Sequence, residues 1–100
     1  MTDEWAREDR LRMAREREHV ASAIARAQVE WRALLEVVER SASADEAQET
    51  LAQSFGFTRV QAIAVMDTQF RRVTQADRER IATELDQLRR EIEELGGDAT

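Results

Sequence analysis

The sequence predicts an all-α protein, an antiparallel coiled-coil arm of two long helices that carries a small helical knob at one end. Its 100 residues include no proline and three glycines, so few residues interrupt a helix. Apolar residues near both ends of the chain recur in alternating steps of four and three, which is the repeat of a coiled-coil seam. The stretch between these seams holds several helix-cap patterns. A single domain over residues 1–100 is therefore expected.

The first long helix is expected over residues 3–40. Acidic residues at its start suit the positive end of the helix dipole. Pairs such as Glu8 and Arg12 place an acid four residues before a base, which is the favourable order. Because this helix is longer than the returning one, residues before about Arg17 are expected to lack a partner within the chain. The predicted seam consists of Val20, Ile24, Trp31, Leu34 and Val38.

A knob of two short helices is expected over residues 44–73. Ser43 with Glu46, and Thr58 with Gln61, have the spacing of a capping box, in which two residues three apart satisfy each other's backbone amides. The second short helix carries apolar residues on two faces, so it needs two packing partners. One of these partners is its own chain, and the other is more easily a second chain.

The two apolar faces of this second short helix are assigned different roles. One face, with the residues just before the helix, is expected to close the core of the knob within the chain. The other face is expected to meet a second copy across a two-fold axis. The predicted knob core consists of Phe55, Phe57, Val60 and Ile63, together with Ala64. The predicted dimer interface consists of Ala62, Met66 and Phe70.

A returning helix is expected over residues 75–95. Thr74 precedes it as a cap, and Asp77 places negative charge in its first turn. Two glycines end it, and residues 96–100 form a tail. The predicted seam of this helix consists of Ile81, Leu85, Leu88 and Ile92.

A resemblance to a known family is strongest in residues 55–74. Phe55 and Gly56 are followed at fixed offsets by the cap residue Thr58, by a glutamine–alanine pair and by Asp67. This pattern resembles the tip of the coiled-coil arm in the A subunit of DNA gyrase and of its topoisomerase IV relative. Weaker likeness extends over roughly residues 10–95. The resemblance implies the exit gate of that family, the C-gate, where two subunits meet.

Composition argues against several functional classes. A net charge of −6 and a pI of about 4.8 disfavour direct binding to nucleic acid. The chain has no cysteine, no apolar run that would span a membrane and no tyrosine, the residue with which the resembled family cleaves DNA. His19 has no companion of metal-ligand type, and the acidic residues near Glu91 are best interpreted as a solvated helix face. We therefore expect no enzyme activity, no metal, no cofactor, no small-molecule substrate and a cytoplasmic location.

The function that we expect from the sequence is self-association without catalysis, as a homodimer that resembles the exit gate. Two alternatives stay open at this point. The chain is a modulator that binds the gyrase A subunit by forming a mixed gate, or it is a helical adaptor for an unrelated protein. The sequence alone separates the homodimer and the modulator poorly, and capture of the gyrase A subunit would distinguish them. A monomer with an exposed seam would favour the adaptor.

Overall fold

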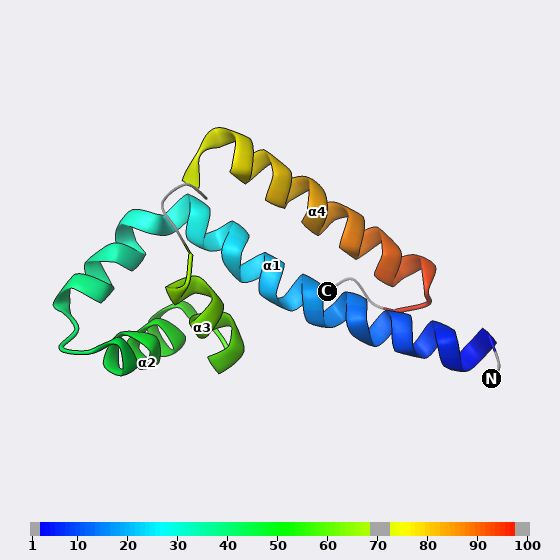
Figure 1. The fold of residues 1–100 in the computed structure, drawn as a ribbon, viewed down its shortest axis with the longest axis horizontal. Helices are drawn as coiled ribbons and strands as arrows, with labels where there is room; N and C mark the ends of the chain where they lie inside the picture. Colours follow the sequence, from blue (N-terminus) through cyan, green and yellow to red (C-terminus); the bar gives the residue numbers. More distant parts are fainter. Residues whose placement is uncertain (1–2, 69–72, 98–100) are drawn as a thin grey trace.

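The computed structural model describes residues 3–68 and 73–97. The described residues form helices and no strand, so the predicted all-α class is confirmed (Figure 1). Phe70, one of the three predicted interface residues, lies outside the described residues. The helices in chain order are α1 (Asp3–Arg40), α2 (Ala44–Phe55), α3 (Arg59–Met66) and α4 (Gln75–Glu94).

Helix α1 is not straight, because Glu30 has non-helical backbone angles of φ −104° and ψ 22°. Before this kink, α1 runs beside α4 (Figure 1). Beyond the kink, α1 bends towards α2. Helices α2 and α3 lie together on the side of α1 away from α4. We call α4 and the α1 residues that pack on it the arm, and we call α2, α3 and the α1 residues that pack on them the knob. Between Ala21 and Ala27, α1 contributes to both.

The arm packs through small residues on α1 and large residues on α4. Ala14 and Ala21 of α1 are buried, and Ala21 packs with Leu85 and Leu88 of α4. Alanine allows two helix backbones to approach closely, so the larger side chains of α4 fill the space between them. The four predicted seam positions of α4 are all buried: Ile81, Leu85, Leu88 and Ile92.

The predicted seam of α1 does not lie against α4 along its length. Val20 and Ile24 are half-buried and line a groove between α1 and α4. Leu34 is buried in the knob, Trp31 is half-buried, and Val38 is 37% exposed. The single continuous seam expected on α1 is therefore wrong, because the kink turns its second half towards α2 and α3.

Helix α4 covers more of α1 than the sequence pattern indicates. Ala14 is 3% exposed, and a Cβ placed on Gly97 would lie 2.7 Å from Cδ1 of Leu11. The expectation that residues before Arg17 lack an intrachain partner is therefore wrong for this turn. The physical reason is that the knob occupies α1 beyond the kink, so α4 begins its pairing near Ile24 and reaches further towards the start of α1.

The knob has its own core, to which α1, α2 and α3 all contribute. Leu51 of α2 and Ala62 of α3 are 0% exposed. The remaining buried members of this core are Ala23, Ala27, Leu34, Phe57 and Val65. Each short helix begins at a predicted cap, because the side chains of Ser43 and Thr58 accept hydrogen bonds from the third amide of their helices. Among the described residues, no helix is both long and apolar enough to cross a membrane.

Leu51→Ala should destabilise the protein by about 2–5 kcal/mol, because it leaves a cavity at the centre of the knob core. Urea unfolding followed by circular dichroism measures this free energy. Val29→Ala is the control, since Val29 is 75% exposed and its loss should change stability by no more than about 0.5 kcal/mol. Equal stability losses in the two variants would contradict the position of the core.

Candidate interaction surface on helix α3

Helix α3 buries one side and exposes the other. Ala62 and Val65 pack into the knob core at 0% and 7% exposure. Val60 and Ile63 are 58% and 42% exposed, and they lie three residues apart, so they share one face of the helix. Met66, three residues further on, is half-buried beside the core. We call Val60, Ile63 and Met66 the outer stripe of α3.

The structure reverses part of the expected division between core and interface. The sequence predicts that Ala62 faces a second copy, but Ala62 is fully buried within its own chain. It also predicts that Val60 and Ile63 close the core, but both are exposed. The reason is geometric: Leu51 and Phe57 already occupy much of the core, so α3 buries Ala62 and Val65 there and leaves Val60 and Ile63 outside.

The connection between α2 and α3 is held against α1 by Arg26. The rings of Phe55 and Phe57 stack with centroids 5.9 Å apart. The Arg26 guanidinium lies 5.2 Å and 5.3 Å from the two centroids, and its Nη1 donates a hydrogen bond to the carbonyl oxygen of Phe55. Nε of Arg26 also pairs with Glu30 at 2.6 Å. Phe57 is buried and Phe55 is half-buried, so the aromatic pair belongs to the knob.

An apolar cavity of about 180 Å³ lies between α3 and the second half of α1. Trp31, Leu35 and Val38 line it from α1, and Met66 lines it from α3. The cavity therefore continues the outer stripe towards α1. The side chains that line it are apolar except for Thr68, whose hydroxyl donates a hydrogen bond to the carbonyl oxygen of Ala64.

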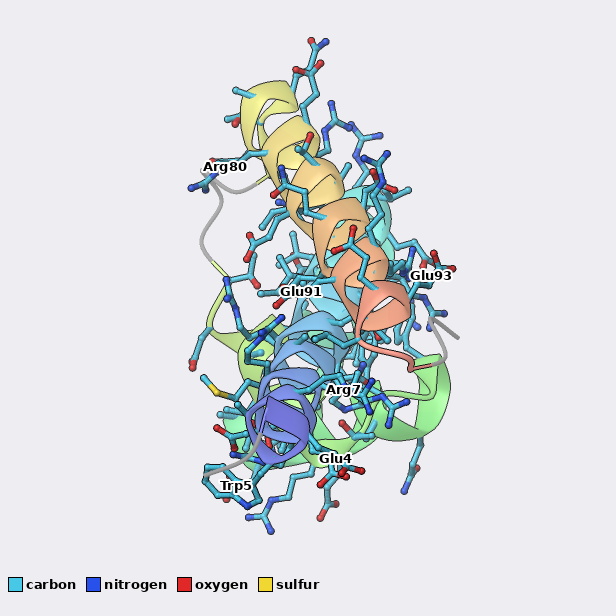
Figure 2. The ribbon with its side chains drawn as sticks, turned by 90° about the vertical axis from the view of Figure 1, so that its right-hand side faces the viewer. Glu4, Trp5, Arg7, Arg80, Glu91 and Glu93 are labelled. Carbon is cyan, nitrogen blue, oxygen red and sulfur yellow. The ribbon has the colours of Figure 1, made fainter. Side chains whose placement is uncertain are left out.

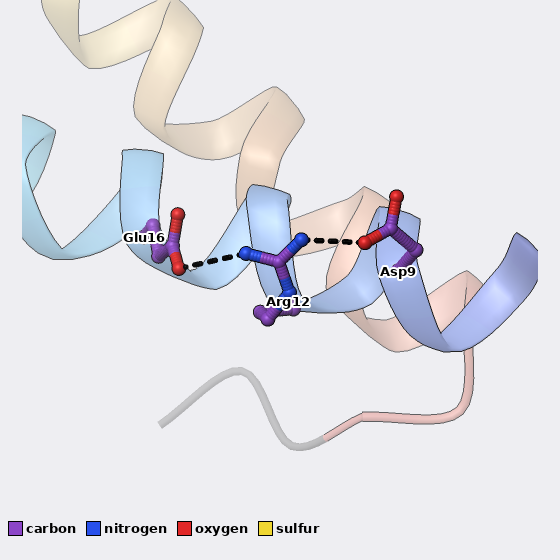
Figure 3. A network of polar contacts seen from close by, with 3 residues as sticks. All are labelled: Asp9, Arg12 and Glu16. Atoms are coloured by element: carbon purple, nitrogen blue, oxygen red, sulfur yellow. Dashed lines mark hydrogen bonds and ion pairs between the residues drawn. The ribbon is translucent and has the colours of Figure 1, made fainter.

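The acidic and basic side chains of the described residues form pairs along helix surfaces. In Figure 3, Arg12 lies between Asp9 and Glu16, at 2.5 Å and 3.2 Å. The hydrogen bond that Arg12 donates to Asp9, and then its pairing with Glu16, raises the pKa of Arg12 above its usual value. All three residues are at an exposed or half-exposed helix surface, where such pairs contribute little to stability.

No metal-ligand cluster is found within the part of the chain that the structure describes. Glu91 and Glu93 lie on different sides of α4 (Figure 2). His19 lies within 2.7 Å of Thr58, its Nε2 facing the threonine hydroxyl. The sequence pattern indicates only a position on the arm for His19, because a contact between residues 39 positions apart leaves no local pattern.

Comparison with known proteins finds similarity to one kind of protein. No family model matches the chain. Over 85 residues, the chain is 32% identical to the DNA gyrase A subunit of Deinococcus deserti, 34% identical to that of Treponema pallidum and 31% identical to that of Campylobacter jejuni. Each match covers 85% of this chain but 10% of the relative.

The chain thus spans about a tenth of the length of the curated relatives it matches. Such a match concerns one region of the gyrase protein and leaves the rest of it without a counterpart in these 100 residues. The resemblance seen in the sequence is confirmed at this level: the chain is related to a limited region of the DNA gyrase A subunit.

Proposed function

We propose that this chain is a non-catalytic self-association module that uses the outer stripe of α3, in the manner of the exit gate it resembles. The observation that carries the proposal is the exposure of Val60 and Ile63, at 58% and 42%, on one face of a short helix. Exposed aliphatic side chains that share a helix face favour burial against a partner. Two copies related by a two-fold axis would place the same stripe on both sides of the contact.

The surroundings of the stripe support this role. A stable interface usually buries more than about 1,000 Å² in total, so it needs more apolar surface than Val60 and Ile63 alone offer. The neighbouring residues supply such surface, because Met66 extends the stripe to the apolar cavity that Trp31 and Val38 also line. In the family that the sequence resembles, this tip of the arm is where two subunits meet.

The alternative with an observation in its favour is a mixed gate with the gyrase A subunit. The chain matches that protein over 85 residues, so the matched region of gyrase would offer a similar surface. A second copy remains the preferred partner, because a self-complementary contact needs no other protein. The acidic balance of the chain, −6 in net charge, makes direct binding to DNA backbone unfavourable in either case.

Ile63→Glu should convert a dimer into a folded monomer. Self-association would desolvate the new carboxylate close to its own copy, a cost on the order of 3 kcal/mol, or about a hundredfold in the dissociation constant. Sedimentation velocity measures the mass, and circular dichroism measures the helix content. The fold should survive because Ile63 lies outside the knob core.

Val29→Glu is the matched control for Ile63→Glu. Val29 is an aliphatic residue at 75% exposure on α1, away from the outer stripe. It receives the same charge, and the variant should remain dimeric. Val60→Glu, at a position that the sequence pattern assigns to the core, should behave as Ile63→Glu does and keep its helicity. A dimeric, folded Ile63→Glu variant would overturn the proposed surface.

No covalent adduct with DNA should form when the chain is incubated with plasmid and then denatured with detergent. The resembled enzymes attack DNA with a tyrosine, and this chain has none. Gel mobility of radiolabelled DNA, with and without protease treatment, reads out any adduct. A protease-sensitive band shift would refute the absence of catalysis.

Co-expression with a DNA gyrase A subunit distinguishes self-association from the mixed gate. If the proposal holds, an affinity-tagged chain should capture an untagged copy of itself and leave the gyrase protein in the flow-through. The variant Ile63→Glu is the control, since it should lose the untagged copy. Stoichiometric capture of the gyrase protein through the same stripe would favour the modulator instead.

A further inference from the structure

His19 lies where the arm meets the knob and contacts α3 through both its side chain and its backbone. Its Nε2 lies 2.7 Å from Oγ1 of Thr58. Its carbonyl oxygen accepts a hydrogen bond from Nε2 of Gln61 at 2.7 Å and another from Oγ of Ser22 at 2.9 Å. His19 of α1 therefore contacts both Thr58, which caps α3, and Gln61 in the first turn of α3.

The same two residues of α3 also hold each other in the capping box. The backbone amide of Gln61 donates to Oγ1 of Thr58 at 3.2 Å, and the amide of Thr58 donates to Oε1 of Gln61 at 3.0 Å. Each side chain of the box thus has one contact inside α3 and one contact to His19. Moving α3 on α1 would break the second contact of both side chains at once.

The chemistry of the hydroxyl group allows this double use. Oγ1 of Thr58 accepts from the Gln61 amide, so its own proton is available for donation to Nε2 of a neutral imidazole. When Nε2 carries a proton instead, it donates to the second lone pair of the same oxygen. Either way the contact requires a hydrogen-bonding atom at the position that Nε2 occupies.

We propose that His19 is the positioning residue that sets the direction of α3 on α1, and thereby the direction in which the outer stripe faces. The first half of this inference concerns one chain only. The second half rests on the proposed function, because it matters only if the outer stripe meets a partner.

The core contacts between α3 and α1 do not supply this direction, and the hydrogen bond of Arg26 to the Phe55 carbonyl oxygen holds the connection that precedes α3. Ala62 of α3 and its core neighbours Ala23 and Ala27 of α1 are small and apolar, and apolar burial is non-directional. An α3 of eight residues is also too short to be stable by itself. The charged neighbours of His19 are engaged elsewhere: Glu16 pairs with Arg12 on α1, and Glu18 pairs with Arg89 on α4.

The test is amide hydrogen exchange, followed by NMR, in His19→Asn and His19→Gln. Asparagine ends near the position of Nδ1 and loses the contact, whereas glutamine reaches the position of Nε2 and can keep it. In His19→Asn, the amides of Ala62 and Val65 should exchange about threefold to tenfold faster, the effect of losing one hydrogen bond. Glutamine should restore most of the protection.

The matched control is Glu18→Asn, which places the same residue one position earlier on the same helix. It touches α4 instead of α3, and its helix-propensity cost is at least as large as that of His19→Asn, because glutamate is a better helix former than histidine. Its α3 amides should exchange at the native rate. Amides of Leu85 and Leu88 report on the arm, and they should be unchanged in both His19 variants.

Two results would overturn the inference. One is an unchanged rate of amide exchange in α3 of His19→Asn. The other is an equal increase in the exchange rates of α3 and α4, which would mean that His19 supports overall stability only. The exchange pattern is measured within one chain and holds whether or not the chain self-associates. Sedimentation of His19→Asn then tests the second half: weaker self-association with α3 still helical is expected, and unchanged association would refute the link to the stripe.

Discussion

The packing of α3 on α1 is the constraint on which the other features of this structure depend. Ala62 reaches 0% exposure in a core that includes two alanines of α1, so the two helices approach more closely than larger side chains would allow. This contact fixes which side of α3 is buried. It also occupies α1 on both sides of Glu30, where the long helix kinks.

The arm is a consequence of that arrangement. Because the knob core takes α1 from Ala23 onward, α4 is left with the earlier part of the helix, where Leu85 and Leu88 pack on Ala21. The cross-helix ion pairs of the arm, Arg17 with Glu84 and Arg89 with Glu18, are exposed or half-exposed and contribute little energy. Burial of large α4 side chains against alanine therefore supplies most of the arm's stability.

The chain is related to a limited region of the DNA gyrase A subunit, and its short helix α3 exposes Val60 and Ile63 on one face. The proposed self-association uses this exposed face. Several polar groups of the described residues hold helices in place: the cap of α3, the surface pair of Arg12 with Asp9, and the contact between His19 and Thr58.

The sequence predicted the all-α class and the helix caps at Ser43, Thr58 and Thr74. Both predictions were possible because caps and helix periodicity depend on residues three or four apart. The face that α3 buries was not predictable in this way. Its two sides are almost equally apolar, and only the space left beside Leu51 and Phe57 selects Ala62 and Val65 over their neighbours. The kink of α1 and the contact of His19 were likewise decided by tertiary packing. The sequence by itself determined where the capped helices begin; the burial of one face over another needed the whole chain, because it compares contacts between residues far apart in sequence.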